Sequence, residues 1–407
     1  MYWNPVLDYV IDMKYDYLTV RPQDLNPITS YEDKGYNNAL EYWAEVLREE
    51  DGYYREVLDS LLVNQYENLV LIKYNSLDVD FDIHNGFYRE CRSVVIDLAE
   101  EELVLTPFRK FFNINEREET QMQIVQEKLK NAKSIEISDK MDGSMVSARW
   151  YNDKLVVAGS QALDPANSYR LEHYYEWFHE NQNAVQLLKN HPDYTFIFES
   201  IWSEDVHVVQ YDEDEEDLYL IGVRDVRTGN EASYRTVEEC AKENGLRSVG
   251  PLTLTFEQMF KQCQESDVAA SEAEGYVVSI DGHKYKCKYQ NYAMMHNVIG
   301  KILSPNAILK AIREDKWDDF YSMIPQAYQP QAKEMADNVF NYIKEAQNEV
   351  KFWGDQVPGT SLKNAMLWIT NNIPREIAGK VRAYYLGKDI DYLKNVKYYQ
   401  IEGKAHE

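Results

Sequence analysis

The sequence predicts an α+β protein with a core of antiparallel sheets, preceded by a helical N-terminal extension and followed by an all-helical C-terminal domain. This prediction rests on how the spacing of apolar residues changes along the chain. Apolar residues recur every three or four positions up to residue 66 and again from residue 293, as on helices. Between these zones the chain has short β-rich runs separated by polar turns, and several runs alternate apolar with polar residues, as in half-buried antiparallel strands. The predicted domains are therefore 1–66, 67–292 and 293–407.

The first zone is predicted to contain two main helices, in YNNALEYWAEVLREE (36–50) and YYREVLDSLLVNQY (53–66). In both segments the apolar side chains recur at helical spacing.

The central zone is predicted to alternate strands with a few helices. The expected helices lie around residues 120–132, 169–190 and 236–244. The expected strands are LVLIKY, RSVVIDL, LVLTPF, MVSARWY, KLVVAGS, YTFIFES, HVVQY, DLYLIGVRD, EGYVVSI and HKYKCKY.

The last zone is predicted to be helical throughout. Its apolar spacing predicts helices in AILKAIREDKWDDFYSMI, KEMADNVFNYIKEAQNEVKFW, SLKNAMLWITNNI and REIAGKVRAYYL. Prolines at 325, 330, 358 and 374 separate these segments, since proline interrupts helices.

The net charge and the cysteine content limit the kinds of ligand and the cell compartment that are expected for this protein. The net charge of −26 argues against a protein that binds any polyanion, because such binding needs clustered basic residues. Residues 1–292 hold 28 basic and 55 acidic side chains, so nucleic-acid contact would be local. The four cysteines are far apart, which favours free thiols in a reducing cytoplasm. The start of the chain, MYWNPVLDYV, lacks the secretory-signal pattern, and no apolar run approaches the ~20 residues that span a bilayer.

The segment Lys140-Met141-Asp142-Gly143-Ser144 has two interpretations. Asp-Gly is a common turn signal, so a polar turn between two strands is the simpler one. Alternatively, the turn presents Lys140 as a covalent nucleophile, which requires a neutral amine and hence burial or nearby cations.

The remaining groups needed for attack on a nucleoside triphosphate also occur in the chain. Such attack needs cations around the phosphates and a carboxylate-bound metal ion. Lys286 and Lys288 are two residues apart and share one strand face. Glu199 ends the strand FIFE, and Glu274 begins EGYVV. Each feature alone has a structural explanation, whereas their joint occurrence favours a nucleotide site.

The order of these segments resembles the covalent nucleotidyltransferases, the superfamily of polynucleotide ligases and mRNA capping enzymes. It is most similar to the RNA ligase 1 family of T-even bacteriophages, from about Ile72 to Tyr292. The segments that carry the resemblance are CRSVVID, KFFNINE, KMDGSMVS, FIFES, DLYLIGVRDVRTGNEASY, EGYVV and KCKYQNYAMMH. Met141, Ala158 and Val206 differ from the residues of the phage relatives.

The resemblance implies a nucleotidyltransferase (ATP-grasp-like ligase) core and a set of roles. Lys140 would form a lysyl–AMP phosphoamide, and Glu274 and Glu199 would hold Mg²⁺ or Mn²⁺. The residues implied to bind ATP are Arg92, Lys110, Phe112, Asp142, Gly143, Ser144, Glu199, Lys286, Lys288 and Tyr292. Of these, Arg92 and Lys110 would hold the outgoing pyrophosphate.

The implied function is that of an ATP-dependent RNA ligase that joins 5′-phosphate and 3′-hydroxyl RNA ends, with nicked tRNA as a candidate substrate in RNA repair. A polynucleotide kinase that heals ends is an implied partner. A monomer located in the cytoplasm, or in the host cytoplasm if phage-encoded, and without membrane contact is expected. The alternatives are a non-catalytic RNA-end or nucleotide-binding protein with the ligase fold, and another polynucleotide ligase or capping-type nucleotidyltransferase. A helical C-terminal zone favours RNA ligases, since DNA ligases and capping enzymes usually carry a β-barrel there.

Overall fold

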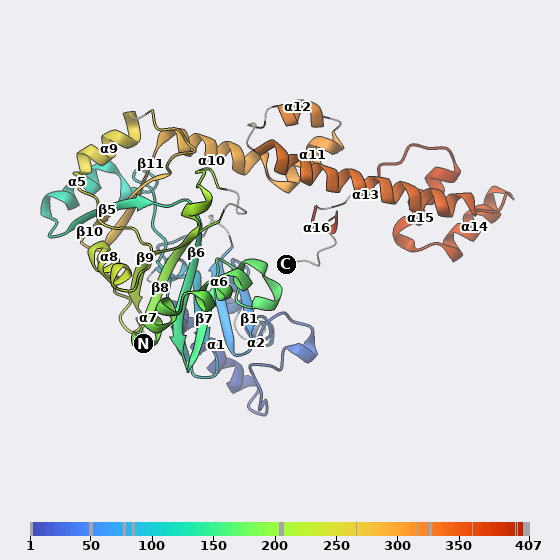
Figure 1. Cartoon of the computed structure of the whole chain (residues 1–407). Coiled ribbons are helices and arrows are strands. Elements are labelled where there is room, and N and C mark those ends of the chain that lie inside the picture. The colour runs from blue at the N-terminus through green and yellow to red at the C-terminus, as the bar shows by residue number, and fades with distance from the viewer. Residues whose placement is uncertain are drawn as a thin grey trace. The chain divides into compact units, whose positions relative to one another are not determined.

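The computed structural model describes residues 3–48, 52–75, 79–83, 86–202, 207–265, 267–314, 316–322, 324, 328–359, 361–394, 396 and 398–401. The contacts within the chain divide it into two compact units, Met1–Ala293 and Met294–Glu407. Unit 1 contains three antiparallel sheets with helices on their faces, and unit 2 contains helices (Figure 1). The described part of the chain is therefore a mixture of helices and antiparallel sheets. Val206 lies outside the described residues.

The first sheet lies at the N-terminal side of unit 1 and has the order β1-β2-β3-β4. Its strands are β1 (Leu61–Tyr66), β2 (Leu69–Tyr74), β3 (Arg92–Asp97) and β4 (Glu102–Leu105). Successive residues of these strands alternate between two hydrophobic clusters, as the two-residue period of a strand requires. Val70 and Ile72 join the cluster of the N-terminal helices, whereas Leu71 joins the cluster on the opposite face.

The N-terminal helices cover one face of this sheet. They are α1 (Pro5–Val20), α2 (Ala39–Leu47) and α3 (Tyr53–Leu58). Asn4 and Asn38 cap the first two, because each side-chain oxygen accepts hydrogen bonds from backbone N–H groups of the first turn. Trp43 is fully buried in the shared cluster. The helical extension thus shares one hydrophobic core with the first sheet.

The prediction of a helix through residue 66 is wrong. The helix α3 ends at Leu58, and the next residues form β1, which pairs with β2 from Leu61 opposite Tyr74 to Tyr66 opposite Leu69. The two strands are joined by a tight turn with Glu67 at a positive φ of 53°. Long-range pairing overrides the local helical spacing here.

The second sheet has the order β7-β6-β8-β9. Its strands are β6 (Ser144–Tyr151), β7 (Lys154–Ala158), β8 (Tyr194–Ile201) and β9 (Asp217–Asp225). The helices α6 (Tyr169–Glu180), α7 (Gln182–Asn190) and α8 (Tyr234–Glu243) pack with it in one hydrophobic cluster, and α6 and α7 lie beside β6 and β8 in Figure 1. Tyr151, Val156 and Ala158 instead join Leu71 and Val95 of the first sheet. The two four-stranded sheets therefore pack against each other.

The third sheet has the order β11-β10-β5. Its strands are β5 (Ile135–Lys140), β10 (Gly275–Ile280) and β11 (His283–Lys288), and α5 (Met122–Asn131) and α9 (Phe256–Glu265) lie close to it in the chain and in Figure 1. The strand β5 ends at Lys140, and β6 of the second sheet begins at Ser144. The Lys140 turn thus joins two sheets.

One further strand prediction is wrong, and a helix in the central zone was missed. The segment HVVQY (207–211) is irregular, because the N–H groups of Val208 and Val209 bond to the side chain of Asp142 and not to a neighbouring strand. The helix α9, which covers Cys287 with Cys263, was not predicted.

The short elements of unit 1 are α4 (Phe87–Glu90) and the 3₁₀ helices Glu32–Lys34, Glu118–Thr120, Pro165–Asn167 and Glu213–Glu215. Helix α10 (Gln290–Ile302) contains the boundary between the units. Unit 2 continues with α11 (Pro305–Arg313), α12 (Trp317–Ser322), α13 (Gln329–Asp355), α14 (Leu362–Asn372), α15 (Arg375–Tyr385) and α16 (Tyr398–Ile401). The described residues of unit 2 contain no strand. Among the described helices of the chain, none combines the length and apolar character needed to cross a bilayer.

Candidate active site

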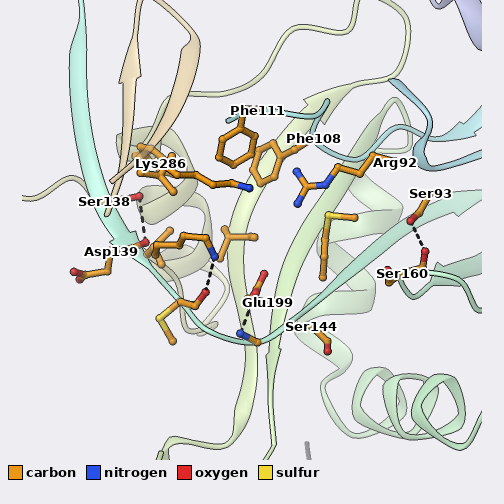
Figure 2. A pocket seen from close by; sticks show the side chains of 18 of the residues that line it. Arg92, Ser93, Phe108, Phe111, Ser138, Asp139, Ser144, Ser160, Glu199 and Lys286 are labelled. Atoms are coloured by element: carbon orange, nitrogen blue, oxygen red, sulfur yellow. Dashed lines mark hydrogen bonds between the residues drawn. The ribbon is translucent and has the colours of Figure 1, made fainter. Parts of the chain in front are cut away.

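A cavity of about 360 Å³ opens beside the Lys140 turn (Figure 2). Its lining combines cationic, acidic and apolar side chains from all three sheets. The lining residues are Lys73, Tyr74, Arg92, Ser93, Phe108, Phe111, Ser138, Asp139, Lys140, Met141, Gly143, Ser144, Met145, Ser160, Glu199, Ile221, Tyr234, Val249, Val277 and Lys286. Such a lining suits a ligand that has both an apolar ring and negative charge.

The register of the third sheet places the predicted lysines on one face. Gly275 of β10 pairs with Lys140 on one side and with Lys288 on the other. Position 275 must be glycine, since its φ is +145° and a Cβ would lie 2.2 Å from the carbonyl oxygen of Cys287. Glu274 directly precedes this pair and so lies between the two lysines.

Glu274 binds both lysines at a buried position. Its Oε1 is 2.8 Å from Lys140 Nζ and 3.0 Å from Lys288 Nζ, and its side chain is 2% exposed. The Lys288 amine also lies over the ring of Tyr292, 5.1 Å from its centre. The arrangement holds Lys140 at the wall of the cavity.

Asp142 fixes the turn after Lys140 through both carboxylate oxygens. Oδ2 accepts hydrogen bonds from the N–H groups of Val208 at 2.8 Å and Val209 at 3.0 Å. Oδ1 accepts a bond of 2.8 Å from the Tyr292 hydroxyl. The Asp142 N–H donates to the Tyr211 hydroxyl at 2.9 Å. Asp142 therefore shapes the turn and does not line the cavity.

Gly143 allows the turn to approach β8 closely. Its N–H donates to Glu199 Oε1 at 3.1 Å. A Cβ at this position would lie 2.4 Å from the Ser200 carbonyl oxygen, so no other residue fits without a backbone shift. Ser144 follows as the first residue of β6, pairs with Ser200 and lines the cavity.

Glu199 lies at the floor of the cavity, below Arg92 and Lys286 in Figure 2. Burial raises its pKa from 4.5 to about 7; the charge of Lys140 lowers it, and that of Glu274 raises it further. The native state therefore favours the protonated carboxyl at pH values where an unfolded chain would carry the charge. A cation bound between Glu199 and Glu274 would offset the repulsion between their two carboxylates.

This shift predicts a pH dependence of stability in metal-free buffer. Because the folded state holds the Glu199 proton more tightly than the unfolded state, the free energy of unfolding should fall as the pH rises from about 4.5 through about 7. The loss is expected to reach about 3 kcal/mol by pH 8. Urea unfolding with EDTA across this range measures it.

The matched variants are Glu199→Gln, which keeps an acceptor for the Gly143 N–H, and Glu180→Gln on the exposed face of α6. Only the first should flatten the profile. An equally steep profile in Glu199→Gln would contradict the assignment of the shift to this carboxyl.

Two further cations face each other across the cavity. Figure 2 shows the side chains of Lys286 and Arg92 pointing toward one another from opposite walls. Burial, followed by the charges of Arg92 and Lys140, lowers the pKa of Lys286 well below its usual value. Burial also lowers the pKa of Arg92. The cavity thus gathers positive charge that an anion would stabilise.

An aromatic wall covers one side of these cations. The Phe111 ring lies 4.8 Å from Lys286 Nζ and 5.4 Å from the Arg92 guanidinium carbon. Phe108 stands beside Phe111, with 6.3 Å between ring centres. Tyr234 and Val277 extend the apolar lining.

Six predicted site residues do not line the cavity: Lys110, Phe112, Asp142, Glu274, Lys288 and Tyr292. Phe112 is 3% exposed and packs in the core with Phe81 at 5.3 Å between ring centres, so Phe111 occupies the position that the sequence suggested for it. Lys110 Nζ lies over the rings of Tyr74 and Phe112, 5.4 Å from each centre.

Tyr292 and Lys288 also lie behind the cavity wall, where they support Asp142 and Glu274. The other departures from the phage pattern lie close by: Met141 lines the cavity, and Ala158 is buried at the end of β7.

The structure adds residues that the sequence did not single out. Lys73 of β2 lines the cavity, and Tyr211 holds the turn through the Asp142 N–H. A lysine within the apolar strand LVLIKY is the signal that could have drawn attention to Lys73. Tyr211 had no local signal, because its contact spans 69 residues.

Oxygen ligands for a divalent cation are present in Glu199 and Glu274. The described residues contain no group of three or more His, Cys, Asp or Glu side chains placed to hold a metal. Two carboxylates suit Mg²⁺ or Mn²⁺, which commonly complete their coordination with water and phosphate oxygens. Burial and, to a smaller extent, the charge of Glu274 raise the pKa of Glu199, and a bound cation would offset both effects.

Comparison with known proteins identifies the family. The model of a family described as RNA ligase matches residues 90–292. This chain belongs to the RNA ligase family. The matched segment contains every predicted site residue, from Arg92 to Tyr292. No curated protein matches the sequence of this RNA ligase family member.

Solved structures of an RNA ligase from Naegleria gruberi are similar to this RNA ligase family member over less than half of its chain. The structure with pyrophosphate has 18% identity and a TM-score of 0.34, and the match covers 43% of this chain and 56% of that one. A lysine-to-alanine variant with ATP and Mn has 16% identity and a TM-score of 0.34, covering 42% and 55%. A glutamate-to-alanine variant with AMP and Mn has 17% identity and a TM-score of 0.34, covering 43% and 55%. The chain thus spans about half the length of these structures.

Proposed function

We propose that the protein is an ATP-dependent RNA ligase with a nucleotidyltransferase core, in which Lys140 becomes covalently attached to AMP. The observation that carries this proposal is the position of Lys140 Nζ: it lies 2.8 Å from the buried Glu274 at the wall of a cavity that also contains Arg92, Lys286 and an aromatic wall. Membership in the RNA ligase family supports the same reaction.

In the first step the neutral Lys140 amine attacks the α-phosphorus of ATP. The N–P bond forms, the bond from the α-phosphorus to the bridging oxygen breaks, and pyrophosphate leaves with the electron pair while the amine proton passes to solvent. Arg92 and Lys286 offset the negative charge that the phosphates bring into the cavity. The aromatic wall of Phe108 and Phe111 offers a surface for the nucleotide.

Glu274 forms an ion pair with the Lys140 amine at 2.8 Å. A divalent cation held by Glu274 and Glu199 would compensate both carboxylates and the phosphate charge when bound. The residues of the turn then orient the amine, because the hydrogen bonds of Asp142 and Gly143 fix the backbone that follows Lys140.

Two transfers complete the proposed reaction. The AMP passes from Lys140 to the 5′-phosphate of an RNA end, as the P–N bond breaks and a P–O–P bond forms. A 3′-hydroxyl then attacks the 5′ phosphorus, the strand is sealed, and AMP leaves. A polynucleotide kinase would supply the 5′-phosphate end where RNA cleavage has not left one. Four free cysteines fit a reducing cytoplasm, and we propose that the ligase acts there as a monomer.

We propose nicked tRNA as the RNA that the ligase repairs, and unit 2 as the part of the chain that makes the ligase prefer this substrate. Sealing of a nicked tRNA and of a linear RNA by the full chain compares these substrates directly.

The covalent step predicts a change in the mass of the intact protein. Incubation with ATP and Mg²⁺ or Mn²⁺ should add one adenylate, and later addition of inorganic pyrophosphate should remove it, because the first step is reversible. Intact-protein mass spectrometry measures both. A protein that binds ATP without any mass change would instead be the non-catalytic nucleotide-binding protein.

A further inference from the structure

Two cations stand directly opposite each other at one edge of the cavity. Lys73 of β2 pairs with Arg92 of β3 in the first sheet. Like charges at directly opposite positions of a sheet are destabilising, so such a pair needs an anion or a solvated environment. Lys73 is partly buried, and burial followed by the charges of Arg92 and Lys110 lowers its pKa. Without a bound anion, the repulsion between Lys73 and Arg92 therefore lowers the stability of the folded protein.

The backbone is distorted at this pair. The register between β2 and β3 shifts between Ile72 and Lys73, which is a β-bulge. Ser93, next to Arg92, has a φ of +68°, a region that non-glycine residues rarely adopt. Bulges commonly redirect a side chain, and here both cationic side chains line the cavity.

Ser160 holds the pair in place from the segment after β7. Its hydroxyl accepts a hydrogen bond of 2.7 Å from Lys73 Nζ. Its carbonyl oxygen accepts a bond of 2.6 Å from the Ser93 hydroxyl, which is drawn in Figure 2. A lysine restrained by a neutral serine keeps its charge uncompensated, unlike Lys140 and Lys288, which share Glu274.

Arg92 provides a second, independent observation that indicates an anion site. Its Nη1 is buried and has no hydrogen-bond partner among the described residues. Buried polar groups without a partner are rare, and for a charged donor the cost is larger. The other charged groups that act on these cations are Lys110, Lys140, Lys286, Lys288, Glu199 and Glu231, so that cations outnumber carboxylates.

We propose that Lys73, together with Arg92, binds the two outer phosphates of ATP and stabilises the departing pyrophosphate. This inference rests on the proposed adenylylation of Lys140. It gives Lys73 the place in the pyrophosphate site that the family resemblance implied for Lys110, whose amine lies over Tyr74 and Phe112. As the bond from the α-phosphorus to the bridging oxygen breaks, the electron pair moves onto pyrophosphate, and the two cations offset the added charge.

The proposal predicts that Lys73 acts in one chemical step only. Lys73→Met keeps the aliphatic stem and removes the charge. It should slow adenylylation by ATP about 10- to 100-fold, the effect of losing one charged hydrogen bond to a phosphate. Sealing of RNA that already carries a 5′-adenylate involves no pyrophosphate and should change less than about twofold. Lys73→Arg should restore most of the first step.

The control is Lys154→Met, an exposed lysine at the far end of β7, which should change neither step. Equal losses in both steps for Lys73→Met would show a structural role and overturn the proposal, as would normal adenylylation.

A direct binding measurement separates this proposal from the proposed function. Calorimetric titration of the unadenylylated full chain with inorganic pyrophosphate should show binding that Lys73→Met weakens about 10-fold or more. If wild-type protein bound pyrophosphate in this way but gained no AMP, the proposed function would fail and the anion site would stand. Pyrophosphate binding that is identical in Lys73→Met would remove Lys73 from the site.

Discussion

Replacement of Lys140 by alanine is expected to abolish covalent labelling by α-labelled ATP, with a fall in rate of at least about 10⁴-fold. The physical reason is that no other described amine combines the required position and surroundings. Lys288 shares Glu274 but lies outside the cavity lining, and Lys286 enters the cavity from β11 under the Phe111 ring. Neither stands at the junction of two sheets, where a turn fixed by Asp142 presents the Lys140 amine.

The measurement is a time course of label incorporation, read after denaturing electrophoresis. Lys140→Arg keeps the charge beside Glu274 and should be equally inactive, whereas Lys154→Met should behave as wild type. Sealing of RNA that already carries a 5′-adenylate should survive in Lys140→Arg to a larger extent, because that step does not use the amine as a nucleophile. Persistent labelling of Lys140→Ala would identify a different nucleophile and refute the assignment.

Replacement of Arg224 by methionine is expected to lower the free energy of unfolding by about 3–5 kcal/mol, the usual cost of leaving one charge of a buried ion pair alone. Arg224 is 4% exposed and binds Glu90 through two bonds, Nη1 to Oε2 at 2.8 Å and Nη2 to Oε1 at 3.1 Å. It also donates to the carbonyl oxygens of Pro107 at 2.7 Å and Gly229 at 2.9 Å. The methionine leaves Glu90 with Arg109, which is half exposed and 3.8 Å away.

Urea unfolding at neutral pH measures this loss. The control is Arg227→Met in the same hairpin, since Arg227 is 70% exposed and pairs with Asp193 at the surface. That variant should change stability by less than about 1 kcal/mol. Adding Glu90→Gln to Arg224→Met should recover part of the loss, because the buried negative charge is removed. An Arg224→Met protein as stable as the control would show that the pair contributes nothing.

The strands that carry the site were the most predictable part of the fold. FIFES, EGYVV and HKYKCKY form β8, β10 and β11 close to their predicted bounds. Short apolar runs rich in β-branched and aromatic residues mark the buried strands β8 and β10, and alternation of polar and apolar residues marks β11. Residues 61–66 were predicted as helix and form β1, since their partner β2 rather than their own spacing decides their conformation. HVVQY has the β-branched and aromatic residues typical of a strand, but the N–H groups of Val208 and Val209 bond to a carboxylate 66 and 67 residues away in the chain.

The sequence by itself determined which chemical groups the protein has and the order in which they occur. Lys140, the two glutamates and the lysine pair on β11 could be selected from their residue types and spacing. Only the tertiary structure decided which of them meet: it paired Glu274 with two lysines, buried Phe112, turned Phe111 to the cavity and set Lys73 opposite Arg92. The reason is that strand register and turn geometry depend on contacts between distant residues, and a shift of one residue in register reverses the face on which every side chain lies.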